Sequence, residues 1–280
     1  MSALTTHNLL DSDIQQLINE ISRKHNIPEK WLTEDIQELA SDSLSQWFLL
    51  RKIDDALAIG YPYAYLVGKV QFLDLTLRIK EGVFIPRPET EQLVELAIQK
   101  IKQYKDVPVV ADFCAGSGAI GLAIKKHVPE SDVWLVERNP TACLIIKENA
   151  RRLNIKVNLI CESCFYNKAK SLLKHNVTFV ISNPPYVLPK ELNQVDRSVI
   201  QYEPKEAWLA PPSDPLYYYR EIISQYGNPQ KVLLLFEGSP AIYEDVLRLL
   251  NEAGYERTSV IKDFSGKERF ILGEPSSTDE

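Results

Sequence analysis

The sequence is poor in cysteine and histidine and has no long apolar run. It contains four of each residue among 280. Cys161 and Cys164 form a Cys-x-x-Cys pair, but no second pair follows and the histidines are scattered, so we expect neither a metal site nor a disulfide framework. No apolar stretch approaches the ~20 residues of a membrane span, and the N-terminus lacks the basic and apolar regions of a signal peptide. We therefore expect a cytoplasmic protein without a membrane partner.

The sequence also lacks an excess of positive charge. With 32 Lys and Arg against 38 Asp and Glu, its net charge is −6. A protein that clamps long nucleic acid through its phosphates needs the opposite balance, so we expect no stable nucleic-acid binding. A hydrophobic content of 45% and a charged content of 25% are typical of a globular protein, and 280 residues suffice for one large and one smaller domain.

Amphipathic helical patterns occupy the first part of the chain. Residues 12–15 resemble a capping box, and apolar residues follow at helical spacing. The same spacing recurs over 33–39 and 41–59, where Gly60 and Pro62 end it. We expect residues 1–62 to form a small N-terminal helical domain.

A strand pattern follows these helices. Leu73, Leu75, Leu77 and Ile79 alternate with other residues, which predicts a strand over 72–79. A hairpin partner is expected just before Gly68. Residues 63–82 would then form a β-hairpin connector between two domains.

Strand and helix patterns alternate over residues 83–280, which indicates an α/β domain with a mostly parallel sheet covered on both faces. Only a short turn around 265–267 separates the last two strands, so we expect them to pair antiparallel. The predicted strands are 107–113, 133–137, 157–160, 177–182, 232–236, 258–263 and 269–272.

A glycine-rich loop follows the first strand of this domain. Its sequence, with Gly116, Gly118 and Gly121, formally matches Gly-x-Gly-x-x-Gly, and Glu137 ends the second strand about 20 residues later. Such a loop lets the backbone approach a ligand closely, and the acid can accept hydrogen bonds from the two hydroxyls of a ribose. Together they predict an adenosine-containing cofactor without specifying which one.

Residues 183–186, Asn-Pro-Pro-Tyr, directly follow the apolar strand over 177–182. Asn183 offers a side-chain acceptor, the prolines free neighbouring carbonyls from the sheet, and Tyr186 can cover a planar group. Such a set can grip a planar group that carries an NH2. The alternative is an ordinary strand-to-loop turn with a surface tyrosine.

The rest of the site separates the possible cofactors. A nicotinamide-dependent dehydrogenase needs a proton donor or acceptor, and no histidine or lysine stands out at a strand terminus, whereas methyl transfer needs alignment and a substrate clamp. Methyl transfer to an amino or amide nitrogen is therefore the favoured function.

Several segments together resemble the protein-glutamine N5-methyltransferases that modify class I peptide chain release factors. The most specific are residues 82–91 (Gly-Val-Phe-Ile-Pro-Arg-Pro-Glu-Thr-Glu) and 183–186, and residues 62–68, 202–204 and 263–269 add further matches. The resemblance implies a class I S-adenosylmethionine-dependent methyltransferase fold, Rossmann-like with an antiparallel last strand, and an N-terminal domain that recognises the substrate. It also implies methylation of the glutamine in the Gly-Gly-Gln motif of these factors, its partner proteins, with S-adenosylhomocysteine as coproduct.

The resemblance also assigns site residues. Asn183 and Tyr186 would be catalytic. The substrate glutamine would be held by Asn183, Pro184, Pro185, Tyr186 and Phe84. S-adenosylmethionine would be bound by Asp112, Cys114, Ala115, Gly116, Ser117, Gly118, Glu137, Cys164 and Asn183. For residues 86–89, the first turn of a helix with a proline start and favourable acids is an equally good explanation.

This chain departs from the family pattern in the glycine loop, where Cys114 and Ala115 replace a glycine and a threonine. After the third strand, Ser163 and Cys164 stand where an acid and a tryptophan are usual, which puts the adenine contact in doubt.

Two alternative functions remain open from sequence. The same clamp would suit an N-methyltransferase acting on an exocyclic amine of adenine or guanine in DNA or rRNA, which should bring a basic groove. A non-catalytic module that binds a translation factor is the other alternative, and it would have no reason to bind the methyl donor.

Overall fold

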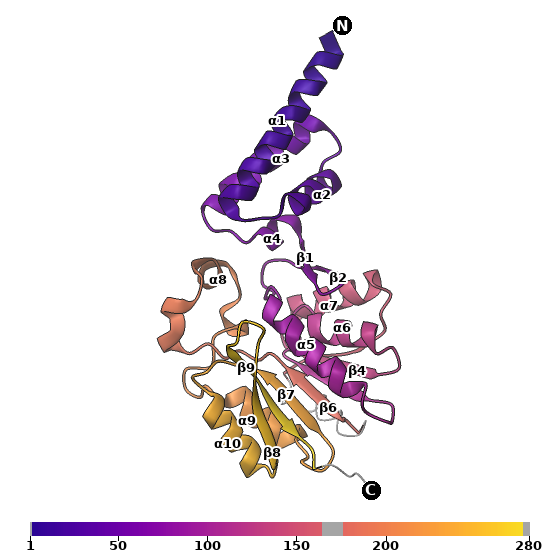
Figure 1. Ribbon diagram of the computed structural model, residues 1–280, viewed down its shortest axis with the longest axis vertical. Helices are drawn as coiled ribbons and strands as arrows, with labels where there is room; N and C mark the ends of the chain where they lie inside the picture. The colour runs from indigo at the N-terminus through magenta and orange to yellow at the C-terminus, as the bar shows by residue number, and fades with distance from the viewer. Residues whose placement is uncertain (1, 164–175, 277–280) are drawn as a thin grey trace. The chain divides into compact units, whose positions relative to one another are not determined.

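The computed structural model describes residues 2–163 and 176–276, with side chains from residue 11 onward. The chain divides into two compact units (Figure 1). We call Met1–Lys69 with Arg197–Tyr202 the helical unit, and Val70–Asp196 with Glu203–Glu280 the sheet unit. None of the described helices combines the length and the apolar composition of a membrane span.

The helical unit contains the three helices expected from sequence, but the predicted start of the first helix was wrong. The first helix begins about ten residues before the predicted capping box at 12–15, which therefore lies inside it. Buried Ile21, Leu32 and Ile53, one from each of the three helices, belong to a shared apolar core. The helices of this unit are α1 (Ser2–His25), α2 (Glu29–Leu39), α3 (Ser43–Ala58), α4 (Tyr63–Val67) and α8 (Arg197–Tyr202).

The hairpin lies later than the sequence predicted. The stretch just before Gly68 is the helix α4, and the hairpin partner is β1 (Lys69–Phe72), which pairs with β2 (Leu75–Arg78). Gly68 has a left-handed φ of 69°, which ends α4 and turns the chain into β1. Leu73 belongs to the tight turn, where its own φ is 51°.

The described part of the sheet unit has a seven-stranded sheet in the order β5-β4-β3-β6-β7-β9-β8. Neighbours from β5 to β7 pair parallel, and β9 pairs antiparallel to both β7 and β8. The predicted antiparallel pairing of the last two strands is confirmed, and every predicted strand exists with ends shifted by at most two residues. The strands are β3 (Val109–Phe113), β4 (Asp132–Glu137), β5 (Asn158–Cys161), β6 (Phe179–Ser182), β7 (Leu233–Glu237), β8 (Arg257–Lys262) and β9 (Glu268–Glu274).

Helices cover both faces of this sheet. Side chains of α5, α6 and α7 share one buried apolar cluster with the strands, and side chains of α9 and α10 share the other. The longer helices are α5 (Pro88–Ile101), α6 (Ala119–His127), α7 (Pro140–Arg152), α9 (Tyr217–Tyr226) and α10 (Tyr243–Glu252), and the 3-10 segments are η2 (Pro189–Gln194) and η3 (Lys205–Ala207).

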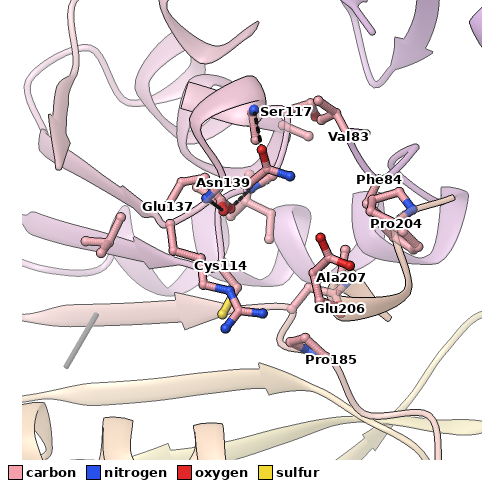
Figure 2. Close-up of a pocket in the computed structure, with 18 of the residues that line it drawn as sticks. Val83, Phe84, Cys114, Ser117, Glu137, Asn139, Pro185, Pro204, Glu206 and Ala207 are labelled. Carbon is pink, nitrogen blue, oxygen red and sulfur yellow. Dashed lines mark hydrogen bonds between the residues drawn. The ribbon is translucent and has the colours of Figure 1, made fainter. Parts of the chain in front are cut away.

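The strand order reverses between β3 and β6. From β3 the chain adds β4 and β5 on one side, and then returns to place β6 and β7 on the other. Loops that leave the carboxyl ends of β3 and β6 therefore diverge and leave a crevice between them, the usual ligand position in such sheets. A cavity lies there (Figure 2).

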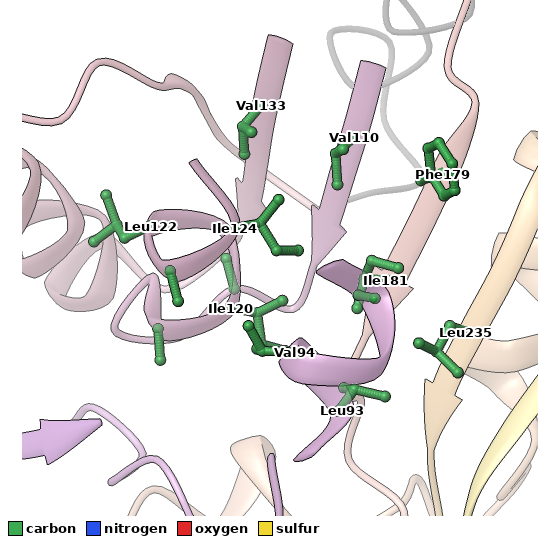
Figure 3. Close-up of a cluster of buried hydrophobic side chains, with 14 of the residues drawn as sticks. Leu93, Val94, Val110, Ile120, Leu122, Ile124, Val133, Phe179, Ile181 and Leu235 are labelled. Carbon is green, nitrogen blue, oxygen red and sulfur yellow. The ribbon is translucent and has the colours of Figure 1, made fainter. Parts of the chain in front are cut away.

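The apolar pattern of each central strand explains why both faces are covered. Phe179 and Ile181 of β6 face one cluster, whereas Val180 between them faces the other. Figure 3 shows the first cluster, in which Leu93 and Val94 of α5 lie near Ile181 and Leu235. Strands buried on both faces need such continuous apolar runs.

Candidate active site

The cavity between the loops after β3 and β6 is lined by loops that follow four strands, by residues within 82–90 and 204–207, and by Tyr218 of α9. Figure 2 shows Glu137, Asn139 and Ser117 on one side of it and Phe84 and Pro204 on the other. The lining comprises residues 82–84, Pro86, Thr90, 114–117, Ala119, Ile120, 136–139, Ala142, Glu162, Ser163, Asn183, Pro185, Pro204, Glu206, Ala207 and Tyr218.

The glycine loop has the backbone that its sequence predicts. Gly118 has a φ of 83°, and a Cβ there would come within 3.1 to 3.2 Å of side chains of Leu122, Ile146 and Leu135. Gly116 has a φ of 57°, and a Cβ there would meet nothing within 4 Å. Gly118 is thus required by packing, whereas Gly116 leaves open space in the cavity wall.

Cys114 also has a left-handed backbone, with a φ of 60°. The left-handed region costs a residue with a Cβ roughly 1–2 kcal/mol, and glycine avoids that cost. The family resemblance noted from sequence implies a glycine at the position of Cys114. The departure from the family pattern therefore keeps the backbone shape and adds strain.

Glu137 is oriented by the loop backbone. One carboxylate oxygen accepts from the Gly116 N–H at 2.8 Å, and the other accepts from the Asn139 N–H at 2.7 Å. Burial raises the pKa of Glu137, and these hydrogen bonds oppose that rise. Each oxygen has a second lone pair, so the carboxylate can also accept from hydroxyls of a ligand.

Asp112 does not line the cavity. It is fully buried at the end of β3, where Oδ2 accepts from the Gly121 N–H at 2.9 Å. Within the described part of the chain, Oδ1 has no hydrogen-bond partner. Burial raises the pKa of Asp112 to about 8. Its position connects β3 to α6, and a direct contact with a cofactor stays a prediction.

A buried chain of hydrogen bonds fixes the Asn183 side chain. Asn183 Nδ2 donates to Thr90 Oγ1 at 3.0 Å, and the Thr90 hydroxyl donates to Glu237 Oε2 at 2.8 Å. Tyr186 donates to the other oxygen of Glu237 at 3.0 Å. Because the Thr90 hydrogen is engaged by the carboxylate, Thr90 can only accept from Asn183. Asn183 Oδ1 is then the amide atom that can accept a hydrogen bond from a ligand.

Glu237 at the centre of this chain is 1% exposed. Burial raises its pKa, while the hydrogen bonds from Thr90 and Tyr186 and the charge of Arg269 oppose the rise. Burying a carboxylate is tolerable only when its oxygens are hydrogen-bonded, and both are. We therefore regard Glu237 as the fixed centre of this hydrogen-bond network, with Thr90 and Tyr186 on either side of it.

The Phe84 ring packs against Arg87, which forms an ion pair with Glu203. The Arg87 guanidinium lies 4.4 Å from the centre of the Phe84 ring, and it pairs with buried Glu203 at 2.5 Å. The second oxygen of Glu203 accepts from the Ile85 N–H at 3.0 Å. Arg87 is also the N-cap of α5, with Pro88 at the first helical position. The segment thus starts a helix and positions a cavity residue at once.

The structure brings most of the predicted site residues together. Those that line the cavity are Phe84, Cys114, Ala115, Gly116, Ser117, Glu137, Asn183 and Pro185. Gly118, Pro184 and Tyr186 stand next to lining residues in the sequence without lining the cavity themselves, and Asp112 lies two positions before the lining residue Cys114. Cys164 lies outside the described residues.

Sequence reasoning missed several residues. Glu162, an acid one position before Ser163, also lines the cavity, and its position after β5 could have marked it. Thr90 was quoted only as part of a motif. Glu237 was not predicted, because its partners lie 51 and 147 positions away in the sequence. Among residues 2–163 and 176–276, no group of three or more His, Cys, Asp and Glu is placed to hold a metal ion.

Comparison with known proteins identifies the fold. The Methyltransferase small domain family model matches residues 74–202. The human Mettl16 catalytic domain, solved with an RNA hairpin, has a TM-score of 0.54 at 12% identity over 72% of this chain and 77% of that one. The T. thermophilus 16S rRNA N2 G1207 methyltransferase RsmC has a TM-score of 0.50 at 15% identity over 74% of this chain and 50% of that one. These likenesses show the class I methyltransferase fold.

Curated relatives have a higher sequence identity to this chain than these solved structures do. A release factor glutamine methyltransferase from Bacteroides thetaiotaomicron is 31% identical over 75% of this chain and 74% of its own length. Its namesake from Chlamydia trachomatis is 31% identical over 95% of this chain and 87% of its own length. The release factor glutamine methyltransferase from Rhodopirellula baltica is 35% identical over 76% of this chain and 73% of its own length. This chain belongs to the release factor glutamine methyltransferase family.

Proposed function

We propose that this protein transfers a methyl group from S-adenosylmethionine to the side-chain amide nitrogen of a glutamine in class I peptide chain release factors, at their Gly-Gly-Gln motif. The observation that carries the proposal is the chain of hydrogen bonds from Glu237 through Thr90 to Asn183. It leaves Asn183 Oδ1 as a fixed acceptor in a cavity that also has the features of an adenosine site.

The residues present fit the methyl donor. The backbone at Gly116 leaves space that a Cβ would otherwise occupy, and Glu137 can accept from the two hydroxyls of a ribose. We assign the loop 114–117 to the methionine part of the donor and Glu137 to its ribose. When bound, S-adenosylmethionine supplies a methyl group activated by the adjacent sulfonium charge.

Asn183 would act on the glutamine amide. The nitrogen lone pair of an amide is delocalised into its carbonyl, so the nitrogen is a poor nucleophile. Asn183 Oδ1 can accept one N–H of the amide, and a backbone carbonyl beside Pro184 or Pro185 can accept the other. Both hydrogens are then held, and the nitrogen is oriented toward the activated methyl group.

Apolar lining excludes water from the reacting atoms. Val83, Phe84, Ile120 and Val136 contribute apolar surface to the cavity. Water exclusion strengthens the hydrogen bonds of Asn183 and suppresses hydrolysis of the activated methyl donor. A methylated amide nitrogen that still carries both hydrogens is strongly acidic, so it can lose one to solvent after transfer, as the product leaves the cavity. The reaction therefore needs no general base before transfer.

The partner in this proposal is the release factor itself. We assign the helical unit to its recognition, because the cavity residues all belong to the sheet unit and can already hold donor and amide. Translation termination would place the protein in the cytoplasm.

The test is incubation with methyl-labelled S-adenosylmethionine and a recombinant class I release factor, followed by mass mapping of the modified residue. We expect one methyl group on the glutamine of the Gly-Gly-Gln motif, and none on a factor in which alanine replaces that glutamine. Label in rRNA or DNA, with none in the factor, would favour the amine methyltransferase of nucleic acids. Absence of donor binding by calorimetry would favour a binding module.

A further inference from the structure

The turn between β8 and β9 displays an aromatic side chain to solvent. Phe264 is 85% exposed, the largest exposure of any large apolar side chain among residues 11–163 and 176–276. An isolated exposed apolar residue is ordinary on a protein surface. Phe264 differs because of how firmly its turn is held and where the turn lies.

Asp263 ties this turn together. Its Oδ1 accepts from the Ser265 N–H at 2.9 Å, the Ser265 hydroxyl at 2.6 Å and the Lys267 N–H at 3.0 Å. Its Oδ2 accepts from Arg269 Nε at 2.9 Å. Hydrogen bonds from Ser265 and Arg269 hold the pKa of Asp263 well below its ordinary value. The backbone on both sides of Phe264 is therefore fixed before any partner binds.

The turn lies at the edge of the sheet that carries the cavity. Because β9 is antiparallel to β7 and β8 is antiparallel to β9, β8 ends at the same edge as β3, β6 and β7. The Phe264 N–H donates to Gln92 Oε1 at 2.8 Å, two residues along α5 from Thr90. A hollow next to the turn is lined by Tyr186, Ser239, Lys267 and Arg269, among others. One wall of this hollow is thus the tyrosine of segment 183–186.

We propose that Phe264 is a docking anchor for the polypeptide that flanks the target glutamine in the protein substrate. The inference rests on the proposed function and adds the surface that receives the substrate chain. A chain whose glutamine is held by Asn183 can continue past Tyr186 along the hollow to reach Phe264. The exposed ring would be buried against apolar side chains of the release factor. A rigid aromatic that loses little conformational freedom is typical of residues that dominate protein interfaces.

The inference is tested with Phe264→Ala, assayed at varied concentrations of full-length release factor. Burying a phenylalanine is worth about 1.5–3 kcal/mol, and each 1.4 kcal/mol corresponds to a factor of ten. We expect KM for the factor to rise about 10- to 100-fold, while kcat at saturation and the calorimetric Kd for S-adenosylmethionine change less than about twofold. Phe264→Leu should restore most of the affinity.

Leu144 of α7, which is 59% exposed, provides the matched control. Leu144→Ala removes an apolar side chain from another part of the same unit and should leave KM unchanged. An unchanged KM in Phe264→Ala, or an equal rise in the Leu144 variant, would overturn the inference while the proposed function stands. A dimer that Phe264→Ala converts to monomer would assign the ring to contact between copies instead. Failure of the wild-type protein to methylate the factor would remove both proposals.

Discussion

Asn183 Nδ2 donates to the hydroxyl oxygen of Thr90, 93 positions earlier in the chain, at 3.0 Å. The contact joins the loop after β6 to the first turn of α5. It decides which atom of the Asn183 amide is presented to the cavity, because the Thr90 hydrogen is already engaged by Glu237. We therefore predict that Thr90 positions the Asn183 side chain.

Asn183→Ala should lower kcat by about 100-fold or more, because it removes a hydrogen bond made to the reacting amide. The Kd for S-adenosylmethionine should change little, since Glu137 and the glycine loop remain. Single-turnover kinetics and calorimetry on the same preparation measure the two quantities. Near-normal turnover would contradict the role of Asn183.

Thr90→Val should lower kcat about 10- to 100-fold, because the Asn183 amide loses the acceptor that orients it. Thr90→Ser keeps the hydroxyl and should retain most activity. A double-mutant cycle separates positioning of Asn183 from a general loss of structure. Adding Thr90→Val to Asn183→Ala should lower kcat little further, since both substitutions act through the same atom, Asn183 Oδ1. Additive losses would contradict positioning, and thermal unfolding of each variant shows whether the fold is intact.

Glu203→Gln should lower the free energy of unfolding by about 1–3 kcal/mol, because Arg87 loses its buried counter-charge. Denaturant unfolding measures this change. Glu206→Gln is the matched control: Glu206 also lies near the cavity but is exposed, so its loss should cost less than about 0.5 kcal/mol. Equal changes in the free energy of unfolding for the two substitutions would show that the ion pair between Arg87 and Glu203 does not stabilise the fold.

Asp112→Asn should stabilise the protein increasingly as the pH rises. The carboxyl has a pKa of about 8 when folded, against an ordinary value of 3.8. Between about pH 4 and pH 8 the folded state therefore binds more protons than the unfolded state, and the free energy of unfolding falls as the pH rises. The variant lacks this titration. Its advantage over wild type, measured by denaturant unfolding from pH 5 to 8, should grow by at most about 1.4 kcal/mol per pH unit. Parallel stability curves would rule out the raised pKa.

Cys114→Gly should stabilise the fold by about 0.5–1 kcal/mol. Glycine relieves the cost of a left-handed backbone, and part of that gain is lost to its greater freedom in the unfolded chain. The neighbouring substitution Ala115→Gly is the control, because Ala115 has a negative φ and glycine there should destabilise by about 0.5–1 kcal/mol. The two changes should have opposite signs in denaturant unfolding.

The sheet could be predicted because its strands carry continuous apolar runs bounded by turn residues. Val110, Ala111 and Phe113 of β3 are all fully buried, which is the pattern that distinguishes a parallel strand covered on both faces. The helix α4 was missed because its five residues are too few to show a helical period. The first helix was predicted too short for a related reason: residues 2–11 show no clear apolar stripe.

The site was predictable where its residues follow strands and not where distant segments meet. Asn183 and Glu137 stand at strand ends, so their sequence positions place them at the crevice. Thr90 lies on a helix, and its role depends on Glu237, 147 positions away. The ion pair between Arg87 and Glu203 spans 116 positions. No local pattern in a single sequence encodes such pairings.

The position of helix α8 in the helical unit matters for the design of chimeras between related proteins. It belongs to the helical unit although 127 residues of chain, Val70–Asp196, separate it from Lys69. The Tyr202 ring lies 5.0 Å from that of Tyr61, and its hydroxyl donates to the Ile59 carbonyl at 3.4 Å. Deleting only Met1–Lys69 would remove the residues against which this helix packs. A chimera that combines the helical unit of one homologue with the sheet unit of another has to include both Met1–Lys69 and Arg197–Tyr202.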